Sequence, residues 1–364
     1  MSKKISVILF PILYVVTIII CIYFSYNKGL TGDTGDYFQM AENLPKLTNN
    51  IFPLLYSITL YVISLIGLST FTSSKIVGLI CLLIILSISI RNNFYKKEII
   101  LTLGFKIFSI FYFSWSEPLF ITLFIVYIYL YHQYEEKKIS NIKFTFLAST
   151  ILFLLFITRY SGLFILISLI IYQFWNYLKD KKINYTLIKT TFISGCLSIL
   201  YLIFNYLNFG NFFGDRKRFE LKNTESFFSQ VKNNFITFSH AINPIYTEID
   251  YSILAIRISI IISFLFSILF LFQLIKIKNW ILNKSFYRFL ITNAIVYFLF
   301  ILITSLNTKI DGLNFRLLLP SIFIFYFLII INYIESKRNI NIIYILIFLS
   351  ILINTASVIP SFSN

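Results

Sequence analysis

Residues 5–26 read ISVILFPILYVVTIIICIYFSY, an apolar run without a charged side chain that follows Lys3 and Lys4. A helix needs about 20 such residues to cross the hydrocarbon core of a bilayer, so this run is long enough to span it. It is also longer than a typical signal-peptide core, and no small-residue cleavage pattern accompanies it. We therefore expect residues 5–26 to form a retained membrane anchor.

Comparable runs recur along the 364 residues, which are 58% hydrophobic and only 13% charged, with a mean hydropathy of +0.82. Runs of this length suit helices, whereas outer-membrane barrels use short segments of alternating polarity. The composition therefore predicts an all-α, polytopic membrane helix bundle with about eleven spans. The predicted spans are residues 5–26, 76–90, 99–115, 118–134, 144–158, 162–178, 190–209, 252–275, 286–305, 317–334 and 340–358.

The basic residues orient this predicted bundle. The net charge of +16 comes from Lys and Arg side chains that cluster in short loops between the apolar runs. Such loops face the cytoplasm in membrane proteins. We therefore expect a multi-pass plasma (inner) membrane protein with a cytoplasmic N-terminus. Membrane lipids are expected partners and nucleic acid is not, because no basic patch lies on a soluble fold.

The segment NIFPLLYSITLYVISLIG, Asn50–Gly67, is apolar enough to be a further span. If it crossed the membrane, every later loop would change sides, and most Lys and Arg would face outward, against the positive-inside rule. We therefore expect Pro53–Gly67 to form a helix in the outer interface. The chain then divides into a catalytic-type membrane module at 1–209 with an outer loop at 27–75, an outer loop at 210–251, and C-terminal membrane helices at 252–364.

Several kinds of chemistry find no support in the sequence. Cys21, Cys81 and Cys196 all lie inside apolar runs, which is typical of small core residues rather than of a disulfide or metal set. His132 and His240 have no other metal ligand at a useful spacing, so no metal site is assigned. Walker, G-x-S-x-G and HExxH motifs are missing from the sequence, so ATP-driven transport and serine or zinc hydrolysis lack support.

The first predicted outer loop carries the acid pair Asp33 and Asp36 in the stretch GLTGDTGDYFQMAENL. Asp33, Tyr37, Ala41 and Leu44 recur at helical spacing, which predicts a short amphipathic helix that starts after Gly32. Asp33 can cap this helix by accepting from the backbone N–H of Asp36. It can also serve as a catalytic base, because a capped carboxylate stays ionised. Both interpretations remain open from the sequence.

Glu117 stands at the predicted outer start of the span 118–134, between Ser116 and Pro118. This pattern is typical of a helix N-terminus that is capped by Ser116 and has Pro in its first turn. The alternative is that Glu117 adds a second carboxylate to the same outer cavity as the acid pair.

Three arginines are candidates for binding a phosphate group. Arg159 ends the span 144–158 at the outer face, where it either snorkels toward lipid headgroups or grips a lipid-linked phosphate. Arg216 and Arg316 are the further candidates. A basic run such as residues 216–218 more often reflects simple attraction to headgroups.

These pieces, taken in chain order, resemble the C-type membrane glycosyltransferases (GT-C), which include protein O-mannosyltransferases and aminoarabinose transferases. In that family an acidic residue in the first outer loop is followed by Tyr and Ala at helical spacing, and then by a Pro-Leu segment. Later come a SEPLF stretch, an Arg-aromatic-x-Gly turn and an Arg-x-Leu-x-Pro run. The matching pieces are Asp33, Tyr37 and Ala41, the segment FPLLYSITLYVISLIG, Ser116–Phe120, Arg159–Gly162 and Arg316–Pro320.

The resemblance implies transfer of a sugar from a polyprenyl-phosphate donor to a glycan, lipid or protein hydroxyl at the outer face. Asp33 or Asp36 would be the base, and which of them is left open because Asp33 is not followed directly by a second acid. The substrate-binding residues implied are Tyr37, Glu117, Arg159, Arg216 and Arg316.

The resemblance implies no organic cofactor, and a divalent metal is left open. An O-antigen polymerase or ligase-like enzyme, which would depend on Arg216–Arg218, is one alternative. A flippase or other transporter for lipid-linked sugars is another, although no pair of Gly/Pro-interrupted helices is evident.

Overall fold

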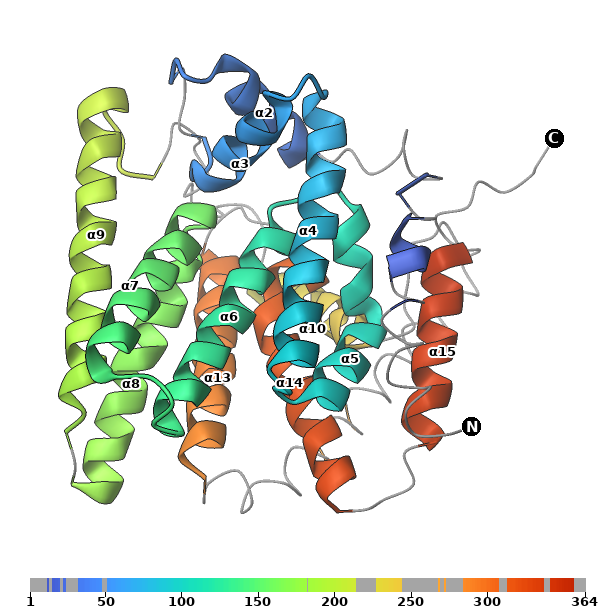
Figure 1. The fold of residues 1–364 in the computed structure, drawn as a ribbon, viewed down its shortest axis with the longest axis vertical. Helices are drawn as coiled ribbons and strands as arrows, with labels where there is room; N and C mark the ends of the chain where they lie inside the picture. The colour runs from blue at the N-terminus through green and yellow to red at the C-terminus, as the bar shows by residue number, and fades with distance from the viewer. Residues whose placement is uncertain are drawn as a thin grey trace.

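The computed structural model describes residues 32–47, 51–181, 183–213, 227–243, 284–307, 313–336 and 341–356, together with the helical residues 12, 15–19, 22–23, 268 and 272. Every regular element in this part of the chain is helical (Figure 1), so the all-α prediction is confirmed for it. The elements are α2 (Gly32–Asn43), α3 (Leu55–Ser64), α4 (Thr70–Arg91), α5 (Lys96–Gly104), the 3-10 helix η1 (Lys106–Tyr112), α6 (Glu117–Glu135), α7 (Asn141–Thr158), α8 (Gly162–Asp180), α9 (Tyr185–Phe209), α10 (Phe227–Ile242), α13 (Ser285–Asn307), α14 (Phe315–Glu335) and α15 (Asn341–Ala356).

Six of these helices are long and apolar enough to cross a membrane, namely α4, α7, α8, α9, α13 and α14. Each coincides with one of the predicted spans, which makes the chain compatible with a multi-pass membrane protein. The predicted spans 118–134 and 340–358 correspond to α6 and α15, which do not meet the same criterion of length and hydropathy. The predicted spans 5–26 and 252–275 lie mostly outside the described residues. The total of about eleven spans therefore stays a prediction.

The predicted continuous span 99–115 is wrong in detail, because the structure breaks it into two pieces. Helix α5 ends at Gly104, Phe105 is extended with φ −70° and ψ −175°, and η1 continues to Tyr112. A 3-10 helix rises about 2.0 Å per residue against about 1.5 Å for an α-helix. The nine residues of α5 and seven of η1 together reach about 28 Å. The broken segment therefore still traverses the bundle.

Short polar side chains fix where several of the long helices begin. Ser69, Ser140, Asn184 and Asn314 are N-cap residues whose side chains accept hydrogen bonds from backbone N–H groups three residues later. Each satisfies one of the N–H groups that a helix start leaves without an intrahelical partner. With these caps, α4 and α9 begin five or six residues before the predicted spans 76–90 and 190–209. The prediction missed these first turns because they are polar and hydropathy detects only apolar residues.

Helices α2 and α3 lie together at one end of the bundle, across the end of α4 (Figure 1). Helix α3 has ten residues, so it reaches about 15 Å and cannot cross a hydrocarbon core of about 30 Å. Its length agrees with the prediction that Pro53–Gly67 does not span the membrane. We call the end that carries α2 and α3 the site end, since the candidate residues meet there.

The predicted outer loop 210–251 contains a helix that packs into the bundle. Helix α10 contacts α13 and α14. The Asn234 amide donates to Ser305 Oγ at 3.1 Å, and the Tyr326 hydroxyl donates to the backbone carbonyl of Ile242. Asn234 is buried, so this hydrogen bond satisfies a polar group that has lost its water. The segment is thus part of the fold.

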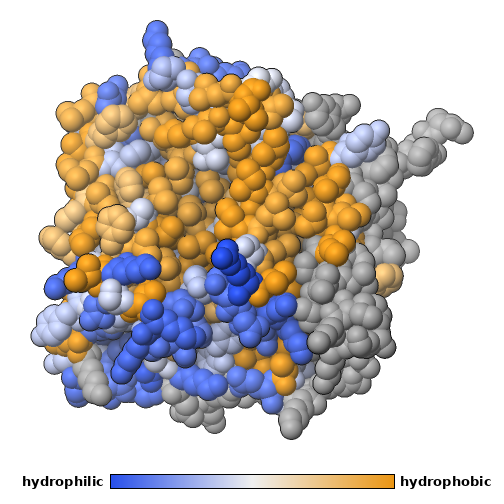
Figure 2. Space-filling view, viewed as in Figure 1, coloured by the Kyte–Doolittle hydropathy of each residue, from blue (hydrophilic) through white to orange (hydrophobic). Residues whose placement is uncertain are grey.

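The two ends of the bundle differ in charge. Figure 2 shows a broad hydrophobic surface over the body of the molecule and hydrophilic residues gathered at the end away from α2 and α3. We call this second end the basic end. Its cationic residues among those described include Arg91, Lys96, Lys97, Lys137, Lys138, Lys143, Lys179, Lys181, Lys284 and Arg288.

Candidate functional site

Five of the sequence-predicted site residues meet at the site end. Asp33 and Tyr37 are supplied by α2, and Glu117 is the first residue of α6. Arg159 is the C-cap residue of α7, and Arg316 lies in the first turn of α14. Four elements that are far apart in the sequence therefore bring two carboxylates, two guanidinium groups and a phenol into one cluster.

Glu117 is the centre of this cluster. Its side chain is only 1% exposed, and its Oε1 accepts a hydrogen bond from Arg316 Nε at 2.8 Å and forms an ion pair with Arg159 Nη1. A carboxylate this deeply buried is stable only when it is paired with positive charge. Its second oxygen, Oε2, is buried without a hydrogen-bond partner among the described residues. Burial disfavours the charge of Arg159, but Glu117, with smaller contributions from Tyr37 and Tyr297, outweighs this effect, and the pKa of Arg159 is raised.

Asp33 joins the cluster through Arg316, because its Oδ2 lies 3.5 Å from Arg316 Nη2. Arg316 thus contacts Asp33 and Glu117 at once, which the planar fork of a guanidinium allows. The Asp33 side chain is 31% exposed, against 1% for Glu117. Of these two carboxylates, only Asp33 is therefore open to a substrate in this arrangement.

Tyr37 supports the cluster from the neighbouring turn of α2. Its hydroxyl donates to Ser116 Oγ at 3.2 Å, and its ring stacks on Phe52 at 4.4 Å and meets Tyr56 edge-on at 5.0 Å. Burial raises the pKa of Tyr37 to about 12, with Arg159 acting in the opposite direction. The phenol therefore stays protonated near neutral pH and acts as a hydrogen-bond donor.

Residues 113–116, which connect η1 to α6, form a platform beneath the charged groups. The Thr34 hydroxyl donates to the Ser114 carbonyl at 3.3 Å, and Ser74 donates to Ser114 Oγ at 2.8 Å. The guanidinium of Arg316 lies over the Trp115 ring at 4.4 Å, a cation–π contact. Helices α2, α4 and α14 therefore all hold this platform in place.

Trp115 and Lys75 are residues of this region that the sequence analysis missed. Lys75 of α4 is 3% exposed, and its ammonium donates to the Tyr112 carbonyl at 2.6 Å, just before the platform. Lys75 directly precedes the predicted span 76–90, in the polar start of α4, so the hydropathy pattern carries no signal for its burial. For Trp115 the sequence offers no signal either, since aromatic residues make up 19% of the chain.

The structure shows that two alternatives drawn from the sequence are wrong, namely capping of α6 by Ser116 and snorkelling of Arg159. Ser116 does not cap α6 with its side chain, because its Oγ accepts from Tyr37 and from Arg159 at 3.5 Å instead. Arg159 does not snorkel toward solvent, because it turns inward to Glu117. In both cases a buried carboxylate and its partners outweigh a contact that the local sequence favours.

The other two predicted site residues are Asp36 and Arg216. Asp36 is partly buried on α2, directly before Tyr37 and about one turn after Asp33. Arg216, with the whole run 216–218, lies outside the described residues. Among the residues that the structure describes, no three His, Cys, Asp or Glu side chains gather as a metal site would require.

Comparisons of the chain with protein-family models, with curated proteins and with solved structures find no match. The functional argument therefore rests on the chemistry of the cluster. Its four charged side chains, Asp33, Glu117, Arg159 and Arg316, sum to zero net charge. An arrangement of this kind can bind an anionic group through its guanidinium groups and accept a proton on the exposed carboxylate.

Proposed function

We propose that this chain is a membrane glycosyltransferase that moves a sugar from a polyprenyl-phosphate donor to an acceptor hydroxyl. The observation that carries the proposal is the meeting of Asp33, Glu117, Arg159 and Arg316 at one end of an apolar helix bundle. A lipid-linked donor keeps its prenyl tail in the bilayer and presents its phosphate and sugar at the surface. A cluster with two guanidinium groups at the end of membrane-spanning helices suits this division.

Asp33 acts as the general base in the proposed reaction. It takes the proton of the acceptor hydroxyl while the acceptor oxygen forms a bond to the anomeric carbon of the sugar. The bond between the anomeric carbon and the phosphate oxygen breaks, and its electron pair leaves with the polyprenyl phosphate. This single displacement inverts the anomeric centre. The exposure of Asp33, compared with the burial of Glu117, supports Asp33 in this role.

The guanidinium groups of Arg159 and Arg316 bind the phosphate and stabilise the negative charge that it gains as it leaves. Their side chains are 17% and 19% exposed, so both are partly open to a ligand. Glu117 is a positioning residue, because its Oε1 pairs with both guanidinium groups and holds them close together. Tyr37 supports the same arrangement through Ser116.

The substitution Asp33→Asn tests this proposal. Removing a general base lowers the rate by about 10²- to 10⁴-fold, so transfer from a labelled polyprenyl-phosphate hexose in proteoliposomes should fall by at least the lower figure. Asp36→Asn reports whether the neighbouring acid shares the role. Glu42→Gln, an exposed change on the same helix, is the matched control and should transfer at the wild-type rate.

Wild-type turnover by Asp33→Asn would remove Asp33 from the mechanism. If the wild-type protein carries the labelled lipid across the bilayer without transferring its sugar, the chain is a transporter and the proposal is wrong.

A further inference from the structure

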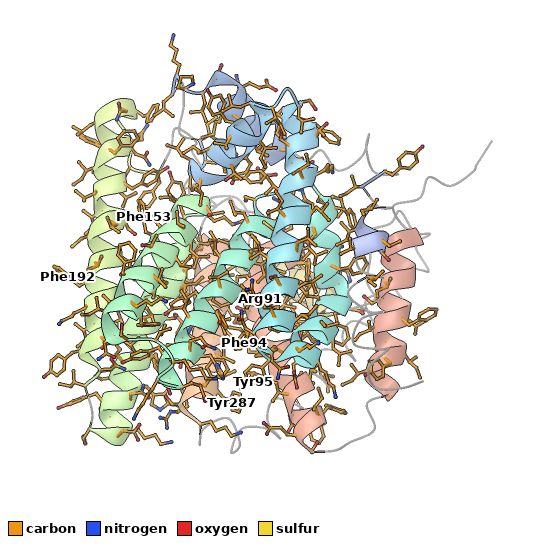
Figure 3. The ribbon with its side chains drawn as sticks, viewed as in Figure 1. Arg91, Phe94, Tyr95, Phe153, Phe192 and Tyr287 are labelled. Carbon is orange, nitrogen blue, oxygen red and sulfur yellow. The ribbon has the colours of Figure 1, made fainter. Side chains whose placement is uncertain are left out.

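A second site lies at the basic end, away from Asp33 and Glu117. A cavity of about 580 Å³ lies where α4 turns into α5, and α6 closes its other side. We call it the α4–α5 pocket. Figure 3 labels Phe94 and Tyr95, which belong to its lining, together with Tyr287 of α13. Its volume falls in the range of about 300–1,000 Å³ that is usual for small-molecule sites.

The charge of the pocket favours an anion. Lys96, Lys97 and Lys138 all belong to the lining, and Glu98 is the only acidic residue in it. Lys97 and Lys138 are exposed, and Lys138 lies 3.9 Å from the exposed carboxylate of Glu136 outside the lining. With His132 neutral, the lining carries a net charge of about +2 at neutral pH.

His132 contributes a fixed polar group to the lining. Its imidazole is enclosed by the rings of Phe94 at 5.1 Å, Tyr95 at 5.5 Å and Phe286 at 5.0 Å. Its Nδ1 is buried and has no hydrogen-bond partner among the described residues. A buried polar atom without a partner is rare in folded proteins, and this one belongs to a residue that lines the pocket.

The backbone at the start of α5 adds to this polarity. Tyr95, the N-cap residue, has φ 42° and ψ 45° and makes no side-chain cap, and the carboxylate of Glu98 instead accepts hydrogen bonds from the backbone N–H groups of Lys97 and Glu98. The left-handed conformation of Tyr95 is held by stacking on Phe286 at 5.7 Å and by a 3.4 Å contact between its hydroxyl and that of Tyr287. The positive end of the α5 dipole favours negative charge, and the Glu98 carboxylate already meets part of it.

We propose that the α4–α5 pocket is a binding site for a phosphate ester. Lysine ammonium groups are donors that phosphate oxygens prefer, and the aromatic rings of Phe94 and Tyr95 provide an apolar surface for the attached organic group. The ester comes either from an anionic lipid headgroup at the membrane surface or from a soluble phosphate compound. The inference does not depend on the transferase reaction at the site end.

Binding measurements on the purified full chain in detergent test the proposal. The probes are dihexanoyl phosphatidylglycerol as the lipid source and glycerol 1-phosphate as the soluble source, with affinity followed by titration calorimetry. The test variant is Lys97→Gln with Lys138→Gln, two exposed positions of the pocket. The matched control is Lys143→Gln with Lys179→Gln, two lysines at the same end outside the lining.

We expect saturable binding of at least one probe by the wild type. Two lost charge-assisted contacts should weaken it by about tenfold or more in the test variant, while the control stays within about twofold of the wild type. Lysine-dependent binding of phosphatidylglycerol alone supports a lipid headgroup, and binding of both probes supports a soluble ester. Equal weakening in both double variants means general attraction to a basic surface and overturns the proposal, as does the absence of saturable binding.

Discussion

Glu117 is the residue on which the candidate site depends. It lies at the start of a helix that continues into the apolar interior, and its single oxygen Oε1 serves two guanidinium groups that come from α7 and α14. Removing one member of such a buried group leaves charge without compensation, which costs more than the loss of a surface ion pair. The cluster is therefore a structural element as well as a candidate site.

Glu117→Gln tests this structural role. The amide keeps the shape of the side chain but leaves Arg159 and Arg316 without its negative charge, so the free energy of unfolding should fall by about 3 kcal/mol. Thermal unfolding in detergent measures the change, with Glu42→Gln as a control that removes an exposed carboxylate bound to Thr70. An unchanged unfolding midpoint for Glu117→Gln would mean that the guanidinium groups find other partners.

At the residue scale, the sequence identified the participants but not their contacts. Charged groups at predicted helix ends marked Asp33, Glu117, Arg159 and Arg316, and helical spacing from Asp33 marked Tyr37. Their meeting depends on helices up to 283 residues apart in the chain, and single-sequence periodicity carries no information on such distances. Local patterns therefore favoured the capping and snorkelling alternatives that the structure corrects.

At the scale of elements, α4 and η1 approach each other very closely at Gly78. A Cβ atom placed on Gly78 would overlap the backbone carbonyl oxygen of Phe111, so the two elements touch backbone to backbone at this point. The contact keeps η1, and with it the platform at residues 113–116, against α4. Helix α4 also supplies Ser74 and Lys75 to the same region. Because Gly78 has no side chain, η1 and the platform at residues 113–116 can pack directly against α4.

Gly78→Ala should lower the free energy of unfolding by about 1–3 kcal/mol, because the added methyl group forces α4 and η1 apart. Gly195→Ala on α9 is the matched control. Its Cβ would come no closer than 4.0 Å to Leu166, so that change should be neutral or stabilising by up to about 1 kcal/mol. Thermal unfolding of both variants measures the two effects. Equal stability of the two variants would show that η1 moves away from α4 at little cost, which would contradict this prediction.

The periodicity and composition of the sequence predicted some of the helices and missed others. The apolar runs located α4, α7, α8, α9, α13 and α14, because a bilayer-spanning helix needs a long apolar sequence whatever its neighbours are. The break at Phe105 and the helix α10 within the predicted loop 210–251 were not located. Both depend on packing against other helices, as the contacts of α10 with α13 and α14 show.

At the scale of the whole molecule, the two ends carry different groups. The site end gathers the paired charges of Asp33, Glu117, Arg159 and Arg316, while the basic end carries most of the surface lysines among the described residues. If the positive-inside rule holds for this chain, the basic end faces the cytoplasm and the proposed reaction takes place outside. The α4–α5 pocket then lies on the cytoplasmic side, on the opposite face from the reaction.

Cysteine accessibility in intact cells tests this orientation. In a background without Cys21, Cys81 and Cys196, a cysteine at the exposed position Gln39 of α2 should react with a membrane-impermeant maleimide. A cysteine at Lys138, exposed at the basic end, should react only after the cells are permeabilised. The charge asymmetry between the ends is the physical reason, since translocating several lysines costs more than retaining them. The reverse labelling pattern would place Asp33 in the cytoplasm, where a donor presented at the outer surface never reaches it.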